Sequence, residues 1–288
     1  MVCGRSTYFT SMRDDVADEM PDLIPLATRF DDRAALAAHV ASLSDLTPPP
    51  EPSPIIGGRA AALSLLAAIN PTRYSATRNH LDGAVTRLSA YIRHGVLTLD
   101  EVRNHALDTV ATPKQAEKFI QELGWRDYWQ RLYAASPDAI WVDVEPYKTG
   151  FFASDYADDL PADIAQGTTG VACIDAFITT LLETGYLHNH ARMYIAAYVV
   201  HWRQIKWQAG ARWFLQNLID GDPASNNLSW QWIASTFANK PYFFNLENVA
   251  SYVGPNINVS AADNFPLAHS YERLAELLFP NLPSKTAV

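Results

Sequence analysis

The sequence predicts an all-α protein, and three observations point to this fold class. Helix-type spacing of apolar residues and helix-capping patterns recur from residue 57 onward, whereas no alternating strand pattern has comparable strength. No G-x-G-x-x-G motif of a dinucleotide-binding sheet occurs. An acidic leader and a proline-rich stretch precede the helical part. We therefore expect an acidic leader and proline-rich strap over residues 1–56 and a helical domain over residues 57–288.

The first elements expected are a helix, the strap and a second helix. Residues 31–43 have the apolar spacing of an amphipathic helix. Residues 47–54 hold five prolines in eight residues, so this strap should run as extended polyproline. Residues 57–69 are rich in Ala and Leu, and the helix expected there stops before Pro71, because proline bars its continuation.

Two capping boxes mark further helix starts, because a hydroxyl at the N-cap and a Glu or Gln three residues later satisfy each other's free amides. The boxes lie at residues 98–101 and 112–115, and Pro113 suits the first helical position of the second. The second of these helices should run to about residue 136. Later helices are expected at 171–184, 188–205, 209–219 and 225–236, separated by Gly185, Gly210 and the turn at residues 220–223.

Composition narrows the function classes. The 288 residues are 48% hydrophobic and 18% charged, and no apolar run approaches the ~20 residues of a membrane span. Cys3 and Cys173 are too few for a disulfide framework or a thiolate metal site, so no metal is expected. No secretory signal is visible, which predicts a cytoplasmic location. The net charge of −9 disfavours non-specific binding to nucleic acid, so any DNA binding must come from a local patch.

One local pattern suggests a site for an anionic ligand, and a second suggests a buried ion pair. Thr86 to Ser89 stand where a helix should begin, and their hydroxyls and amides could cradle a phosphate with Arg87 as counter-charge. The alternative is an ordinary helix cap. Arg192 lies in an apolar helix and needs a carboxylate partner to be buried, for which Asp220 is the candidate. The alternative there is a plain structural salt bridge.

A third pattern places a carboxylate, an aromatic ring and a cation on one helix face. Glu122, Trp125 and Arg126 stand at positions i, i+3 and i+4. Such a face could stack against a base, since aromatic stacking contributes ~1–3 kcal/mol per base. By spacing alone, an amphipathic surface helix is an equally good interpretation.

Longer motifs stand in a fixed order along the chain: GTTGVACIDA at 167–176, TGYLHNHARM at 184–193 and LIDGDPASNNLSWQW at 218–232, with YSATR at 74–78, TRLS at 86–89, ELGWR at 122–126 and PYF at 241–243. Together they resemble the FAD-binding domain of the DNA photolyase and cryptochrome family over roughly residues 57–250. The resemblance implies an all-helical FAD-binding domain. Family members usually add an N-terminal α/β domain that holds a light-harvesting chromophore, and we expect the leader and strap in its place.

The resemblance assigns a set of residues to FAD. The segment from Thr86 to Ser89 matches the one that holds the FAD diphosphate, although Val85 replaces a Thr or Ser that commonly precedes it. Asn226 matches the residue that faces flavin N5, and Asn there favours a fully reduced flavin of photolyase type. The set expected to bind FAD comprises Tyr74, Thr86, Arg87, Leu88, Ser89, Asn189, Arg192, Asp220, Asp222 and Asn226.

The resemblance also implies a cavity for a pyrimidine dimer. Enzymes for the (6-4) lesion have a catalytic His at the position of Asn189, so Asn points to cyclobutane dimers. Two arginines of the family are replaced by His190 and Phe244, and we expect both replacements to remove DNA-facing charge. The set expected to contact DNA comprises Arg78, Glu122, Trp125, Arg126, Asn189, Met193 and Trp232.

Trp230 and Trp207 match the first two members of the tryptophan relay that carries an electron to the photoexcited flavin. The third position falls on Ser154, so the relay as inherited is broken, and flavin photoreduction should be slow. Candidates to replace the outer member are Tyr156, Tyr198, Trp202 and Trp213. The residues expected to serve the reaction itself are Glu122, Asn226, Trp207 and Trp230.

The function implied by the resemblance is light-driven repair of cyclobutane dimers in damaged DNA, by electron transfer from reduced FAD. The sequence leaves open whether that DNA is single- or double-stranded, and it predicts no role for a membrane. One alternative is a cryptochrome-like photoreceptor or redox flavoprotein that acts through a protein partner. Another is an interaction module whose antenna half is supplied by a second chain.

Overall fold

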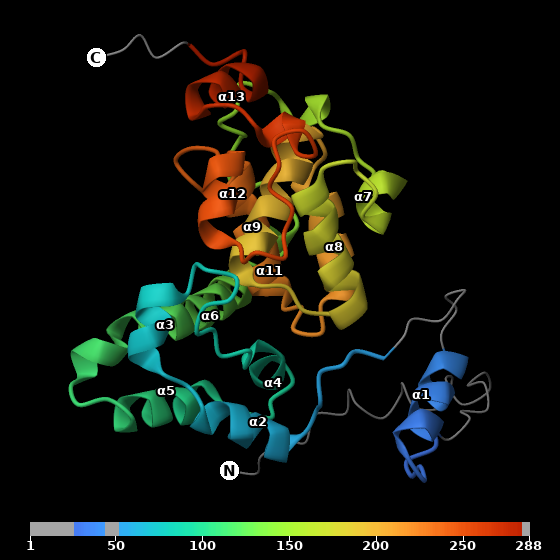
Figure 1. Ribbon diagram of the computed structural model, residues 1–288, viewed down its shortest axis with the longest axis vertical. Coiled ribbons are helices and arrows are strands. Elements are labelled where there is room, and N and C mark those ends of the chain that lie inside the picture. The colour runs from blue at the N-terminus through green and yellow to red at the C-terminus, as the bar shows by residue number, and fades with distance from the viewer. Residues whose placement is uncertain (1–25, 44–51, 284–288) are drawn as a thin grey trace, which may run out of the picture. The chain divides into compact units, whose positions relative to one another are not determined.

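The computed structural model describes residues 26–43 and 52–283. Within these ranges the protein is helical and contains no β-strand, which confirms the predicted fold class (Figure 1). The chain forms two compact units, Met1–Pro52 and Ser53–Val288.

The described part of the first unit contains helix α1 (Arg33–Ser42), so the helix predicted at 31–43 is confirmed. Asp32 caps it, because its carboxylate accepts a hydrogen bond from the backbone N–H of Ala35 at 2.8 Å. No residue of α1 is buried. Most of the predicted polyproline strap, residues 47–51, lies outside the described residues.

The first half of the second unit, cyan to green in Figure 1, packs around a small apolar core. Its main helices are α2 (Arg59–Ala67), α4 (Ser89–Arg93), α5 (Leu99–Asp108) and α6 (Glu117–Ala135). Leu66, Tyr91, Val102 and Phe119 are buried in this core. The capping box of Thr98 is present as predicted, and the one at residues 112–115 opens a 3₁₀ turn (Pro113–Ala116) that continues into α6.

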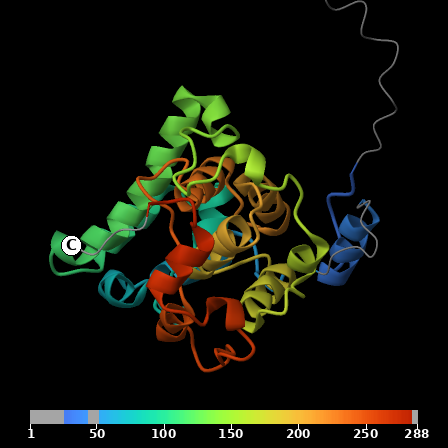
Figure 2. The ribbon, with the colours of Figure 1, turned by 90° about the horizontal axis from the view of Figure 1, so that it is seen from above.

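The larger core lies among the later helices, which run from yellow to red in Figure 1. They are α7 (Ala162–Gln166), α8 (Ala172–Thr184), α9 (Asn189–Ala197), α10 (Trp207–Asn217), α11 (Pro223–Ala234), α12 (Leu246–Tyr252) and α13 (Tyr271–Leu278). Helix α11 packs against α6, α9 and α10, and both ribbon views show the long α6 running beside this group (Figures 1 and 2). Thus α11 joins the two cores.

Two sequence predictions about helix boundaries are wrong. The helix expected at 188–205 ends as α9 at Ala197 and continues only as a π-helical turn, Tyr198–Trp202. Gln204 then adopts a left-handed backbone (φ 48°), which an α-helix cannot accommodate. Gly210 does not separate helices but lies inside α10, where its missing side chain leaves room for the Trp230 ring.

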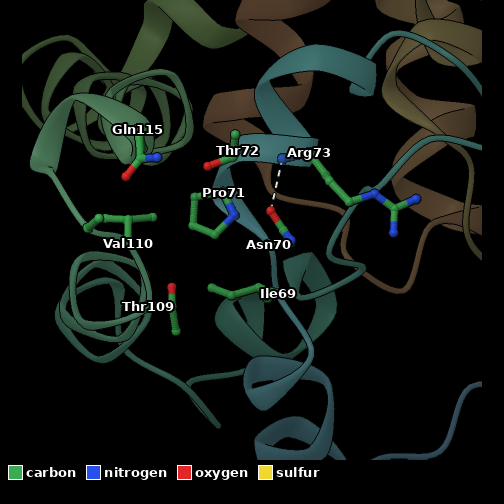
Figure 3. A pocket seen from close by; sticks show the side chains of 9 residues that line it. Ile69, Asn70, Pro71, Thr72, Arg73, Thr109, Val110 and Gln115 are labelled. Carbon is green, nitrogen blue, oxygen red and sulfur yellow. Dashed lines mark hydrogen bonds between the residues drawn. The ribbon is translucent and has the colours of Figure 1, made fainter.

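Short helices make up most of what the sequence did not predict. Pro71 ends α2, as expected, but it also starts α3 (Pro71–Thr77), where Asn70 accepts a hydrogen bond from the Arg73 N–H at 2.9 Å (Figure 3). A surface hollow of about 290 Å³ lies beside this start, lined by Thr109 and Gln115 from the opposite side. None of the predicted site residues lines this hollow.

Candidate functional site

A buried ion pair between Arg192 and Asp220 lies at the centre of the candidate site. Nη2 of Arg192, on α9, lies 3.0 and 2.8 Å from the two carboxylate oxygens of Asp220, in the turn before α11. The Asp220 side chain is 2% exposed and that of Arg192 is 24% exposed. Nε of Arg192 also donates to the backbone oxygen of Leu187 at 2.8 Å. The pair expected from the sequence is therefore present, and its anionic half is the more deeply buried.

The segment from Thr86 to Ser89 lies close to this ion pair, because Arg87 and Arg192 both contact the Tyr186 ring. The guanidinium carbons of Arg87 and Arg192 each lie 5.7 Å from the centroid of the Tyr186 ring. Burial raises the pKa of the Tyr186 phenol. Arg87 is exposed and has a left-handed backbone (φ 55°), and Ser89 begins α4. The sequence analysis did not single out Tyr186, because nothing in a single sequence indicates that it contacts two cations.

Two further candidates for the cofactor lie at the start of α11. Asp222 caps this helix by accepting from the Ser225 N–H at 2.8 Å, and its other oxygen accepts from Nε2 of Gln130 at 2.6 Å. Arg126 lies 3.5 Å from that second oxygen. Nδ2 of Asn226 donates to the Ala211 backbone oxygen at 3.0 Å and faces a neighbouring amide oxygen. Gln130 is a polar partner that the sequence analysis missed.

Glu122 and Trp125 occupy α6 as the i, i+3 spacing predicts. Glu122 pairs with Lys118 at 2.8 Å and with Arg78 at 3.6 Å. Tyr74 packs edge-on against a buried ring of the small core at 5.1 Å, and burial, aided by the Glu122 charge, raises its pKa to about 12. Trp125 is 51% exposed. The charged groups around Trp125 are thus engaged, while its ring faces solvent.

Exposed and half-buried aromatic rings lie on and beside α6 and α11. Trp125 stacks on Trp129 with centroids 5.3 Å apart, and Trp129 contacts Phe237 at 5.7 Å. Trp232, 43% exposed on α11, lies 5.7 Å from the Tyr242 ring. We call Trp125, Trp129, Phe237, Trp232 and Tyr242 the aromatic surface. Two other predicted substrate residues contact each other on α9, where Nδ2 of Asn189 lies 3.7 Å from Sδ of Met193.

The side chains of His190 and Phe244, expected to replace DNA-facing charges, lie inside the protein. Phe244 is fully buried and packs against Tyr194 and Trp202, with centroids 4.6 and 5.0 Å away. His190 is also buried, contacts a backbone oxygen through Nδ1 at 2.8 Å and stacks on Tyr194. Neither side chain therefore reaches the surface, and the loss of DNA-facing charge by these replacements stays a prediction.

The predicted relay residues are buried, and they differ in their indole N–H groups. Trp207 is 0% exposed and donates from Nε1 to Oδ1 of Asp143 at 2.6 Å. Trp230 is 2% exposed, and its Nε1 has no hydrogen-bond partner within the described ranges. Ser154 is exposed in a 3₁₀ turn. Asp143, which the sequence analysis missed, therefore distinguishes the two tryptophans.

Three of the residues predicted to replace the outer relay member are held by ring contacts or a hydrogen bond. Tyr156 stacks on Tyr147 at 4.4 Å, whereas Trp213 reaches Trp230 only through the intervening ring of Phe214. Trp202 is held by a hydrogen bond from Nε1 to the Pro266 backbone oxygen at 2.9 Å. None of these contacts is with Trp207.

The described residues also provide information about metal sites and membrane spans. Among the described residues, no group of three or more His, Cys, Asp or Glu side chains is arranged to hold a metal ion. Across the same residues, no helix combines the length and apolar character that crossing a membrane requires.

Comparison with known proteins gives a consistent result. Residues 119–256 match the family model described as the FAD binding domain of DNA photolyase. The deoxyribodipyrimidine photo-lyase of Streptomyces griseus is 37% identical over 153 residues, which are 53% of this chain and 32% of the relative. The corresponding protein of Halobacterium salinarum is 31% identical over 234 residues, 73% of this chain and 48% of the relative.

Structural comparison supports the fold. The archaeal photolyase of Sulfolobus tokodaii, solved with two FAD molecules, aligns with a TM-score of 0.62 at 24% identity, covering 82% of this chain and 59% of that one. The chain spans only about a third to a half of the length of the two curated relatives. Residues 119–256 thus carry an FAD-binding domain of the DNA photolyase family, and the fold is the one shared by photolyase and cryptochrome structures.

Proposed function

We propose that this protein binds FAD and uses light to split cyclobutane pyrimidine dimers in DNA. The observation that carries the proposal is that α9 and α11 each hold residues of both predicted sets, while the adjoining α6 holds a residue of the DNA set. Helix α9 holds Arg192 and Met193, α11 holds Asn226 and Trp232, and α6 holds Trp125. Because α11 packs on both α6 and α9, a cofactor held inside would lie next to the aromatic surface.

The residues present fit FAD. Oγ of Ser225 and Nε2 of His188 are buried without a hydrogen-bond partner among the described residues. Ser225 precedes Asn226, and His188 caps the helix that carries Arg192. Buried polar atoms are normally hydrogen-bonded, so a polar ligand at this place would satisfy them. Arg87 and Arg192 could face an anionic diphosphate.

Bound in its reduced form, FAD supplies one electron to the dimer on excitation and regains it after the ring has opened. The chain's own residues bind and orient. The rings of Trp125 and Trp232 offer stacking surfaces for unpaired bases. Glu122, held by Arg78 and Lys118, can accept hydrogen bonds from a base edge. The Arg192–Asp220 pair fixes the interior that the cofactor would occupy.

A repair assay tests the proposal. Photoreduced protein is incubated under blue light with single- and double-stranded oligonucleotides that contain a dimer, and dimer loss is measured. We expect repair of at least one substrate in the light and none in the dark. Trp125→Ala should weaken substrate binding, whereas Tyr133→Ala, which removes another exposed ring of α6, should not. Absence of repair of both substrates would refute the proposal.

A second candidate function, photoreception through a protein partner, is favoured by charge. The chain carries a net charge of −9, and the cations nearest Trp125 face carboxylates: Arg78 and Lys118 face Glu122, and Arg126 faces Asp222. Little cationic charge is therefore left for phosphates. A bound flavin that responds to light, with no dimer repair and with stable co-purification of a second protein, would establish this alternative.

A further inference from the structure

The bond between Trp207 and Asp143 has the geometry of a proton-transfer pair. The Trp207 indole is fully buried, and its N–H donates to Oδ1 of Asp143 at 2.6 Å. The same oxygen accepts from Nε2 of Gln208 at 3.1 Å. Asp143 itself is partly exposed, so the carboxylate connects a buried indole with solvent.

The position of Asp143 is fixed by α11. Asn227 donates from Nδ2 to the Ile140 backbone oxygen at 2.7 Å, and the Val144 N–H donates to Oε1 of Gln231 at 3.0 Å. These bonds hold the segment on both sides of Asp143 against the helix that also carries Trp230. A carboxylate held in this way pays little reorganisation when the charge beside it changes.

Trp207 on α10 and Trp230 on α11 lie where these two helices pack against each other. Gly210, three residues after Trp207 on α10, lies so close to the Trp230 ring that a Cβ there would overlap it. The N–H of Trp230 has no acceptor among the described residues, whereas that of Trp207 has a carboxylate. An oxidised indole is far more acidic than a neutral one, so of these two tryptophans Trp207 is the one whose N–H has a proton acceptor among the described residues.

We propose that Asp143 is the proton acceptor of Trp207, and that this pair ends the electron relay without an outer aromatic residue at position 154. The inference rests on the proposed FAD binding. Bound oxidised FAD, once photoexcited, would supply the one-electron oxidant for Trp230, and Trp207 would give one electron to the oxidised Trp230. The Trp207 N–H proton moves to Oδ1 of Asp143, which yields a neutral indole radical and a carboxylic acid. An added thiolate then returns one electron and becomes a thiyl radical, and the proton moves back from Asp143 to Trp207, which restores the indole and the carboxylate.

The variant Asp143→Asn tests the inference, because its amide oxygen can still accept the N–H bond but cannot hold the proton. Flash photolysis of oxidised, FAD-loaded protein without DNA should give a neutral tryptophan radical in the wild type and a radical cation in Asp143→Asn. We expect the yield of long-lived radical to fall by roughly 100-fold, the lower end of what a positioned proton acceptor contributes. A solvent deuterium isotope effect on radical formation should be present in the wild type and absent in the variant.

Two controls separate a proton-transfer role from a structural one. Asp138→Asn changes an exposed carboxylate of the same segment and should behave as wild type. The Trp207 indole N–H resonance, measured without illumination, should stay protected from exchange in Asp143→Asn. A neutral radical that forms equally fast in Asp143→Asn would overturn the inference. Protein that binds no FAD would overturn both proposals, whereas radical formation without dimer repair would overturn only the proposed repair.

Discussion

At the scale of single residues, the Arg192–Asp220 pair gives the sharpest prediction. Asp220→Ala leaves a cation that is three-quarters buried without its partner, although Arg192 keeps its bond to the Leu187 oxygen. Breaking a buried pair costs ~3–5 kcal/mol, and the partial exposure of Arg192 places the expected loss of unfolding free energy near the lower limit, about 3 kcal/mol. Urea unfolding and the flavin content of purified protein measure the two effects, and we expect FAD to be lost.

The control is the equivalent Asp→Ala substitution in an Arg–Asp ion pair that is more exposed to solvent. Arg203 and Asp163 also form a two-bond pair, with Asp163 36% exposed. Asp163→Ala should therefore cost less than about 1 kcal/mol and leave flavin bound. Equal losses in the two variants, or retention of flavin in Asp220→Ala, would show that burial of Asp220 is not what matters.

Histidine burial predicts the pH dependence of stability. Burial lowers the pKa of His201 to about 4, whereas an unfolded histidine titrates near 6.5. Between these two pKa values the unfolded state therefore binds more protons than the folded state. The stabilising contribution of His201 to the free energy of unfolding is thus complete above pH 6.5 and is lost as pH falls toward 4. His201→Gln keeps a donor for the Ile233 oxygen but cannot titrate. From pH 7 to pH 5, urea unfolding should show a loss about 2 kcal/mol smaller in the variant. Identical losses would contradict burial of a neutral His201.

At the scale of elements, local signals in the sequence predicted the helices that have strong boundaries. The capping box at Thr98 and the left-handed Gly185 after α8 are determined by neighbouring residues, so they could be read directly. The end of α9 could not, because no local signal marks the change to a π-helical turn at Tyr198 or the left-handed backbone of Gln204 that follows it. The short helices α3, α4 and α12 have five to seven residues each, too few for a periodic signal.

The contact between α10 and α11 depends on Gly210. In Gly210→Ala the new Cβ would overlap the Trp230 ring, so either the helices must separate or the indole must turn. We expect a loss of unfolding free energy of about 1–3 kcal/mol, as is usual for overpacking, and altered tryptophan fluorescence.

Gly124 on α6 provides the matched control for this variant. A Cβ there would meet no described atom within 4 Å, so Gly124→Ala should raise stability by about 0.5–1 kcal/mol. Thermal unfolding of both variants tests the pair of expectations. A stable Gly210→Ala with unchanged fluorescence would show that α10 and α11 pack less closely than described.

At the scale of the whole molecule, the sequence predicted one ion pair between distant residues and missed other long-range partners. The Arg192–Asp220 pair was expected because a buried cation needs a carboxylate. Gln130, which bonds to Asp222 across 92 positions of the chain, could not be found from local spacing. The same holds for Asp143, whose partner Trp207 lies 64 positions away. The roles assigned to the site residues, and the leader and strap assigned to residues 1–56, stay predictions.

The distribution of charge and aromatic rings predicts how DNA binding should depend on salt. Around Trp125, three cations face two carboxylates, which leaves about one net positive charge beside an exposed ring. Affinity for a single strand falls with salt by about 0.7 logarithmic units per phosphate contact, so one contact gives an expected slope of about −0.7 in log K against log salt concentration. Trp125→Ala should weaken binding by ~1–3 kcal/mol at every salt concentration, because stacking does not release counterions. Arg78→Ala should instead flatten the slope by nearly one phosphate contact.

Fluorescence anisotropy with a labelled dimer-containing strand, titrated at several salt concentrations, measures both the slope and the change in affinity. A slope steeper than about −4 in the wild type would mean that cations remote from Trp125 supply most of the affinity, and the aromatic surface would then not be the main contact with DNA.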